Sequence, residues 1–349
     1  MALATLEGLD EYERRIVFAP LPSGNASVAA AAKEAGFDSV TFHSKWELVK
    51  GLFPWFLRYR SVDIIGTGVS QSFICHALAR LMRVSLRQLQ VAHGGTIENH
   101  AYGRKRHLNR LPVRMVAVSD FVRDKLVEHG VDPEAITVID NFLSDAQRHE
   151  YRPRAPYDPR EDRARPIDRA RVKVAVVSRV DPIKKIDLLV DAVLEKGLAE
   201  FRFDIYGTGG MLDTLRERAA MLPNVHFHGY VADVKDRLAD ADFLLHLCPE
   251  EPFGLVILEA FLTRLVVIVP DAGGAGSLVE DRTTGLRFRA DDSGDLCRVL
   301  DAARNLPAAE LQAMVDAGSA ELDARFSEAE GLRRYREALS ATVRGDLPN

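Results

Sequence analysis

Short β-branched runs alternate with helix-length amphipathic segments along most of the chain, a pattern typical of parallel βαβ units. In the first half this pattern predicts strands at residues 16–20, 39–43, 62–67, 88–93, 115–119 and 136–140. It restarts near residue 172 and predicts strands at 172–178, 201–207, 225–229, 243–248, 266–270 and 285–288. Two similar α/β halves indicate two Rossmann-like domains. Because such sheets bind ligands at the carboxyl ends of their strands, we expect them to face a central cleft.

The alternation stops at residues 152–171, which contain four prolines, many charges and almost no apolar side chains. This composition indicates a solvated connection between domains. An arginine-rich arm for nucleic acid is the alternative, and the interleaved aspartates argue against it. We predict a first domain at 1–150, a linker at 151–171, a second domain at 172–325 and a closing helix at 326–349.

Composition narrows the class of protein. The net charge of −5 gives no general attraction to nucleic acid or to an anionic membrane. The three cysteines lie far apart and form no CxxC pair, which favours a reducing cytoplasm. The first residues are acidic and polar, so we expect no signal peptide, and no apolar run is long enough to span a membrane.

Residues 248–260, CPEEPFGLVILEA, predict a buried helix that nevertheless carries Glu259, with Glu251 just before its start. A buried carboxylate needs a partner, which either the fold or a ligand supplies. If the helix begins near Phe253 or Gly254, its free N–H groups can bind a phosphate. Glu259 would then reach a ribose diol, and Glu251 the hydroxyls of a sugar. The alternative is a capping glutamate followed by a glutamate bonded to local backbone.

Four further candidates lie where predicted strands end. Arg179 and Lys184 flank a turn that opens a helix, where fixed cations suit a diphosphate, although a solvated pair of charges has the same spacing. Gly207 begins a GxGG turn that serves either a ligand or tight packing. Gly24 lies in the first such turn, which is either a phosphate-binding turn or an ordinary one. His93 ends a strand before two glycines and is a candidate proton shuttle or hydroxyl ligand.

Other patterns carry less weight. The triplet Asp240-Ala-Asp242 resembles a metal-binding DxD sequence, but turn or capping roles explain it as well. His226 and His228 have no further ligands at metal spacing. Residues 45–61 hold both tryptophans among basic residues, which is typical of a membrane-interface patch, of an aromatic wall for an acceptor, or of an ordinary packed helix interrupted by Pro54.

These groups occur in the order seen in retaining glycosyltransferases of the GT-B fold, family-4 type, and the chain resembles that family most closely over residues 172–290. The segments that carry the resemblance are SRVDPIKK, YGTGGM, NVHFHGYV, EEPFGLVILEA with glutamates eight positions apart, and GGAGSLVEDRTTGLRF. The family usually has glycine where Ser178, Lys185 and Arg264 stand, and proline in place of Val266.

The resemblance implies a nucleotide-sugar donor held mostly by the second domain, and a closing helix at 326–349 that crosses back to the first domain. Arg179, Lys184 and backbone groups of Phe253, Gly254 and Leu255 would hold the diphosphate. Glu251 would contact the donor sugar, Glu259 the ribose, and His93 the sugar from the first domain. The implied site also includes Gly24 and Gly207, and no metal or other cofactor is required.

The leading hypothesis is a cytoplasmic enzyme that transfers a sugar, with retention of configuration, from a nucleotide-diphosphate donor to a hydroxyl acceptor. The acceptor would be a glycan, a lipid-linked molecule or a natural product, and the sequence leaves open whether residues 45–61 touch a membrane surface. One alternative is a nucleotide-sugar epimerase or phosphorylase on a similar scaffold. Another is a non-catalytic protein that binds sugar nucleotides.

Overall fold

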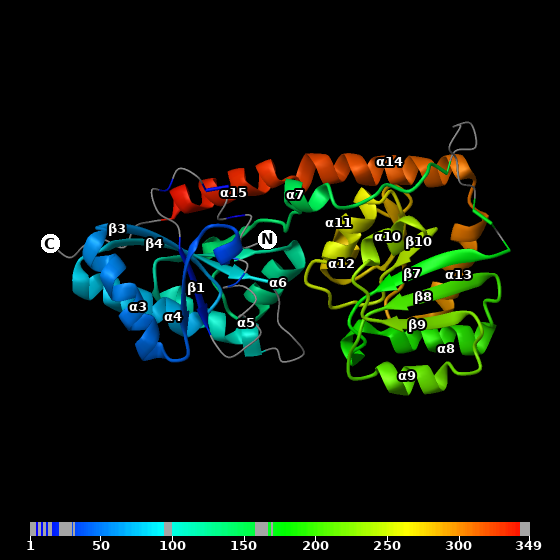
Figure 1. The fold of residues 1–349 in the computed structure, drawn as a ribbon, viewed down its shortest axis with the longest axis horizontal. Coiled ribbons are helices and arrows are strands. Elements are labelled where there is room, and N and C mark those ends of the chain that lie inside the picture. The colour runs from blue at the N-terminus through cyan, green and yellow to red at the C-terminus, as the bar shows by residue number, and fades with distance from the viewer. Residues whose placement is uncertain are drawn as a thin grey trace. The chain divides into compact units, whose positions relative to one another are not determined.

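The structure is a computed structural model that describes Thr5, Gly8, Leu9, Tyr12 and residues 16–20, 30, 32–93, 100–157, 167, 168 and 170–342. The chain forms two compact units (Figure 1). The first comprises Met1–Asn141 and Glu328–Asn349, and the second comprises Phe142–Ser327. The structure therefore divides the chain after Asn141, whereas the sequence suggested residue 150.

The first unit contains two groups of parallel strands. β1 (Ile16–Pro20) pairs with β2 (Asp38–Phe42). The other four lie in the order β3 (Ser61–Gly66), β4 (Ser85–Ala92), β5 (Val113–Ala117) and β6 (Ile136–Val138). Their helices are α3 (Lys45–Arg58), α4 (Val69–Met82), α5 (His100–Lys105), η1 (Arg106–Arg110), α6 (Asp120–Glu128) and η2 (Pro133–Ala135). All the strands predicted in this half are confirmed, with ends shifted by a few residues.

Helix α3 shows how sequence pattern becomes packing in this unit. Ser44 caps it by accepting the N–H of Glu47, and the helix runs on through Pro54 rather than stopping there. Leu48, Leu52 and Phe56 recur every four residues and are buried in the core that α3 shares with α4.

The second unit contains one sheet of six parallel strands, in the order β12-β11-β10-β7-β8-β9. Its strands are β7 (Val172–Val177), β8 (Phe201–Tyr206), β9 (Val225–Gly229), β10 (Phe243–Leu245), β11 (Val266–Pro270) and β12 (Gly285–Phe288). Its helices are α7 (Asp145–Arg148), η3 (Pro182–Lys184), α8 (Ile186–Lys196), α9 (Leu212–Arg218), α10 (Val234–Ala239), α11 (Leu255–Leu262), α12 (Gly273–Ser277), α13 (Ser293–Asn305) and α14 (Ala308–Arg325).

This sheet is covered on its faces by helices, which explains why its strands β10 and β11 are apolar without alternation. Every residue of β11 is buried, and α11, α12 and α14 all contact that strand. On the far side of the strand order, α9 contacts β9 and α8 packs on α9 and α13 (Figure 1). All six predicted strands are confirmed, although β10 ends at Leu245 rather than at residue 248.

Residues 152–157 differ from the solvated connection that their composition indicates. The side chain of Arg154 is fully buried, and its guanidinium donates to the Ala241 carbonyl and to Oδ1 of Asp242, at 3.1 and 3.0 Å. The same guanidinium stacks 3.8 Å from the ring centre of Tyr157, which is also buried. This part of the segment is therefore built into the second unit. It also explains Asp242, whose Oδ2 accepts the Lys173 N–H: the DxD-like triplet serves the fold.

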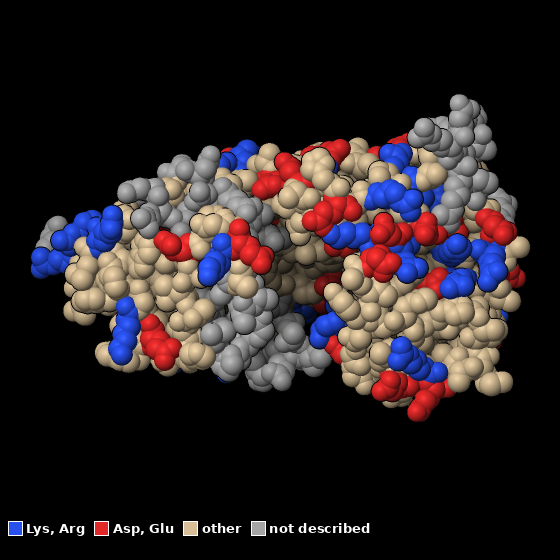
Figure 2. Space-filling model, in the orientation of Figure 1, with Lys and Arg blue, Asp and Glu red and all other residues tan. Residues whose placement is uncertain are grey.

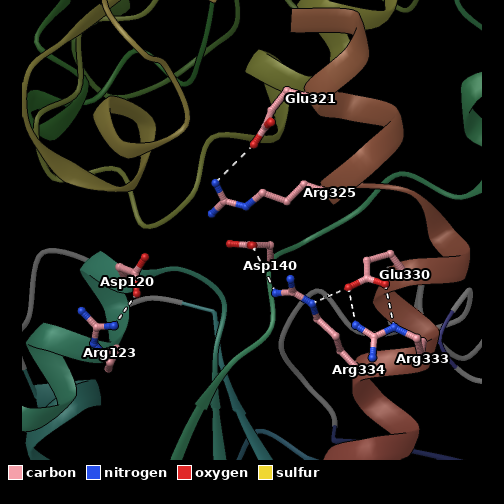
Figure 3. A network of polar contacts seen from close by, with 8 residues as sticks. All are labelled: Asp120, Arg123, Asp140, Glu321, Arg325, Glu330, Arg333 and Arg334. Carbon is pink, nitrogen blue, oxygen red and sulfur yellow. Dashed lines mark hydrogen bonds and ion pairs between the residues drawn. The ribbon is translucent and has the colours of Figure 1, made fainter.

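Helix α15 (Glu328–Ala341) is part of the first unit. Arg334 lies between Glu330 of its own helix and the buried Asp140, 2.8 and 3.7 Å away (Figure 3). Arg336 donates to the carbonyl of Gly8, and Leu332, Tyr335 and Leu339 are buried. These contacts join the last described helix to the unit where the chain begins.

Candidate functional site

The candidate site lies where the second unit's sheet changes winding direction. β7 is the first strand of this unit, and it pairs with β8 on one side and with β10 on the other. The loops that leave β7 and β10 therefore diverge and open a crevice at the carboxyl edge, which is the usual ligand position in such sheets. The first loop carries Arg179 and Lys184, and the second carries Glu251.

Lys184 and Glu251 form the centre of this site. Lys184 Nζ lies 2.6 Å from Glu251 Oε2, and the two side chains are only 15% and 16% exposed. His246 Nε2 lies 3.6 Å from the same carboxylate oxygen, is buried, and has no hydrogen-bond partner among the described residues. Burial lowers the pKa of His246 to about 4, so its imidazole is neutral at pH 7. The structure thus brings together two predicted residues with one that sequence reasoning missed.

The start of α11 supplies hydrogen-bond donors to the same loop. Gly254 caps the helix with φ of +94°, a left-handed conformation that favours glycine. No side chain caps the first turn among the described residues, and that turn carries no acidic side chain. Phe253 is buried against Phe326, which fixes the residue before the cap. The N–H groups of residues 254 to 256 are therefore available to an anion.

Glu259 has a partner that the fold provides. The hydroxyl of Tyr151 donates a hydrogen bond to its carboxylate, which opposes the larger effect of burial in raising the pKa of Glu259. Lys235 lies near both residues, 5.3 Å from the ring centre of Tyr151. A carboxylate accepts several hydrogen bonds, so Tyr151 leaves room for a diol. Tyr151 was not among the predicted site residues, because it lies in the charged segment before β7.

Arg179 is placed differently from Lys184. Its side chain is 61% exposed and pairs with Asp181 at 2.6 Å. Asp181 also accepts the N–H of Gly210 at 3.1 Å, which ties this loop to the glycine-rich turn after β8. Arg179 is therefore a long, exposed cation at the rim of the loop, whereas Lys184 is held beside Glu251 by their ion pair.

Glycines hold the site loops together by close backbone contact. A Cβ at Gly207 would lie 1.9 Å from the Ser178 carbonyl oxygen, so packing against the Arg179 loop accounts for that glycine. A Cβ at Gly274 would lie 2.1 Å from the Pro252 carbonyl oxygen, and the Gly274 N–H donates to the Glu251 carbonyl at 2.6 Å. The GGAG segment therefore supports the loop that carries Glu251.

The backbone explains why the family has glycine at two positions where this chain has another residue. Lys185 and Arg264 stand where the family has glycine, and both adopt left-handed backbone conformations, with φ of 55° and 59°. Lys185 turns away to pair with Asp291 at 2.9 Å, which raises its pKa, and Arg264 pairs with Asp316 at 2.5 Å. Neither pairing places a cation next to Glu251.

A group of metal-ligand atoms also lies in this site. One atom each from His246, Cys248 and Glu251 fall within 4.8 Å of one another. However, Lys184 already neutralises Glu251, and burial raises the pKa of the Cys248 thiol to about 11. The three side chains therefore suit the Lys184–Glu251 ion pair better than they suit a bound metal ion, because a metal needs a deprotonated thiol and an unpaired carboxylate. The absence of a metal requirement stays a prediction.

The predicted residues of the first half lie in the other unit. His93 follows β4 at the carboxyl edge of that sheet and lines a cavity there. The protein atoms around its ring, and the charge of Lys105, lower the pKa of His93, which favours the neutral form. Gly24 lies outside the described residues.

Comparison with known proteins agrees with the fold and with the position of the site. Residues 171–303 match the family model "Glycosyl transferases group 1", and this segment contains the whole β7–β10 crevice. Two parallel α/β units of this kind form the GT-B fold, as predicted from the sequence. The resemblance to glycosyltransferases is therefore confirmed.

Individual relatives refine this comparison. A GDP-mannose-dependent alpha-mannosyltransferase of Mycobacterium tuberculosis is 30% identical over 188 residues, which cover 52% of this chain and only 45% of that protein. A D-inositol 3-phosphate glycosyltransferase of Rhodococcus erythropolis is 27% identical, with all of this chain and 79% of that protein covered. Among solved structures, Anabaena Alr3699/HepE in complex with UDP has a TM-score of 0.79 at 18% identity, covering 97% of this chain and 95% of that one.

Proposed function

We propose that the protein is a glycosyltransferase that moves a sugar from a nucleotide-diphosphate donor to a hydroxyl acceptor. The observation that carries this proposal is the Lys184–Glu251 pair at the switch point, beside the uncapped start of α11. The relatives support a sugar-nucleotide donor, since one is named for GDP-mannose and a structural neighbour was solved with UDP-glucose. Retention of configuration is part of the proposal and rests on the family resemblance.

In this proposal Lys184, Arg179 and the first N–H groups of α11 hold the diphosphate. They stabilise the negative charge that develops as the bond from sugar to phosphate breaks, so no metal is needed. Lys184 exchanges Glu251 for phosphate oxygen when the donor binds. Glu251 is then free to accept hydrogen bonds from sugar hydroxyls, with neutral His246 behind it. Glu259 and Tyr151 hold the ribose, and His93 serves the sugar from the first unit.

A screen of nucleotides tests the donor. Thermal unfolding with UDP, GDP, ADP and dTDP should show one base that raises the melting temperature, because ligand binding stabilises the folded state. Calorimetry with that nucleotide should then show Lys184→Met binding about tenfold or more weakly, the value of one charge-assisted contact. Lys196→Met, an exposed lysine at the end of α8, is the matched control and should bind normally.

Product analysis separates the proposal from its alternatives. Consumption of the sugar nucleotide only when an acceptor is present supports transfer. A new sugar isomer without acceptor, or a requirement for phosphate, would identify an epimerase or a phosphorylase instead. Binding with no turnover under any condition would identify a sugar-nucleotide-binding protein.

We also propose that α3 contacts a membrane surface. Trp46, Phe53 and Leu57 are 66%, 46% and 62% exposed and share one stripe of the helix, in which Lys50 also lies. None of the described helices has the length and apolar character needed to cross a membrane. Over the second unit, by contrast, acidic and basic side chains are interspersed on the face shown (Figure 2). Sedimentation with anionic vesicles tests this contact: Leu57→Ser should weaken it, and Leu81→Ser, another exposed leucine, should not.

A further inference from the structure

A cavity of about 730 Å³ lies within the first unit. Its wall includes Thr67 and Gly68, which follow β3, and Val91 and His93 at the end of β4. β3 and β4 are parallel neighbours, so the cavity lies at the carboxyl edge of their sheet. That edge is where parallel α/β sheets place their ligands.

The lining of this cavity is strongly basic. Five of its twelve described residues carry basic side chains, and none is acidic: the five are His93, Arg104, Lys105, His107 and Arg110. In the described part of the chain no carboxylate forms an ion pair with Arg104, Lys105 or Arg110. Elsewhere in the same unit, arginines such as Arg87 and Arg123 are paired. Arg104, Lys105 and Arg110 thus concentrate positive charge at the cavity, and no described carboxylate pairs with it.

Lys105 is buried, so its positive charge has lost most of its hydration. It is only 6% exposed, and its ammonium donates to the carbonyls of Thr67 and Val91 at 3.3 and 3.5 Å, which are long hydrogen bonds. A buried cation is normally compensated by an anion. The described residues provide none, so this ammonium is suited to bind an anion from solution.

The start of α4 adds donors to the same wall. This helix has 14 residues, and Gly68, Val69, Ser70 and Gln71 at its beginning all line the cavity. Gly68 caps it without a side-chain hydrogen bond. Free N–H groups and the positive end of the helix dipole favour a phosphate at this position.

We propose that this cavity binds the phosphate group of the acceptor substrate. The class of ligand, a phosphate ester, follows from the cavity alone, whereas its role as acceptor rests on the proposed function. Lys105 and the start of α4 contact the phosphate, and Arg104 and Arg110 neutralise it from the rim. His93, on the same wall, lies next to the part of the acceptor that carries the hydroxyl.

Binding is tested without any transfer. Isothermal calorimetry of the full chain with inorganic phosphate and with glycerol 3-phosphate should show binding that Lys105→Met and Arg110→Gln each weaken about tenfold. Arg106→Gln is the matched control, since Arg106 is exposed on the same short helix η1 and does not line the cavity. No binding to the natural chain at millimolar phosphate, or equal losses in Arg106→Gln and Arg110→Gln, overturns the proposal. Circular dichroism and unchanged nucleotide binding confirm that each variant is folded.

Transfer assays then separate the two sources of a phosphate ester. Pairs of a polyol and its phosphate ester, such as glycerol, glucose and myo-inositol with their phosphates, represent soluble acceptors. Vesicles of phosphatidylglycerol against phosphatidylcholine represent a lipid headgroup. Phosphate binding with no transfer would overturn the glycosyltransferase function and leave the cavity's ligand intact. Equal transfer to a polyol and to its phosphate would overturn this inference and leave the glycosyltransferase function intact.

Discussion

The Lys184–Glu251 pair gives the most direct prediction about the site. Three variants, Lys184→Met, Glu251→Gln and the double variant, form a cycle that isolates the free energy between the two side chains. The two single changes should not be equal. Lys184→Met leaves a carboxylate that is 16% exposed, with only His246 at 3.6 Å, whereas the freed ammonium of Glu251→Gln can extend to water. We therefore expect Lys184→Met to lower the free energy of unfolding more.

The geometry sets the size of the coupling. Exposed ion pairs contribute about 0.2–1 kcal/mol, and hydrogen bonds to charged groups about 1.5–3 kcal/mol. The separation of 2.6 Å places this pair in the second class, while exposure near 15% allows some solvent screening. We expect a coupling of about 1.5 kcal/mol from urea unfolding in the absence of ligand.

A saturating nucleotide diphosphate should then remove most of this coupling, because Lys184 changes partner. The same cycle with Lys196→Met in place of Lys184→Met should show additive effects in both conditions. A coupling that stays near 1.5 kcal/mol with nucleotide bound would refute the exchange and the diphosphate role of Lys184. A coupling near zero without nucleotide would refute the resting pair itself.

Three further predictions use free energies of unfolding measured with urea. Tyr151→Phe should cost about 1 kcal/mol at pH 7 and less at pH 4, where protonated Glu259 no longer needs the hydroxyl donor. Arg154→Met should cost about 3–5 kcal/mol by leaving a buried carboxylate on Asp242, and adding Asp242→Asn should restore part of it. His246 should lower the free energy of unfolding by about 3 kcal/mol between pH 6.5 and pH 4. In this range the imidazole is protonated in the unfolded chain but stays largely neutral in the folded protein, where its pKa is about 4. His246→Phe should flatten that slope; an unchanged slope would contradict it.

The fold was largely predictable because buried parallel strands have a strong local signature. All twelve predicted strands exist. Short apolar β-branched runs such as residues 266–270 favour buried strands of a parallel sheet, where both faces are covered. Residues 152–157 were wrongly predicted because the prediction used only local composition. Their composition is that of solvent-exposed chain, and only the tertiary contacts of Arg154 with Asp242, 88 positions away, reveal that they are buried.

The candidate residues could be chosen from the sequence, but their pairings could not. Arg179, Lys184 and Glu251 could be chosen because each follows a strand or precedes a helix, and Glu259 because it is a carboxylate within an apolar helix. Lys184 and Glu251 are 67 positions apart in the sequence, and the residues around either one do not predict their contact. His246 was within reach, since it directly follows a strand of the crevice, whereas Tyr151 lies in a segment without periodicity.

The glycines behind Glu251 have a consequence for how the site responds to change at a distance. Because backbone meets backbone at Gly274 and Pro252, with no side chain between them, a larger residue at position 274 would push residues 249–252 and 273–276 apart. A substitution in α12 that displaces Gly274 would therefore also displace the loop that carries Glu251. A displacement of about 1 Å is enough to misplace a catalytic group and slow an enzyme about a hundredfold. Under the proposed function, substitutions behind Glu251 that touch no substrate, such as Gly274→Ala, should therefore also lower activity.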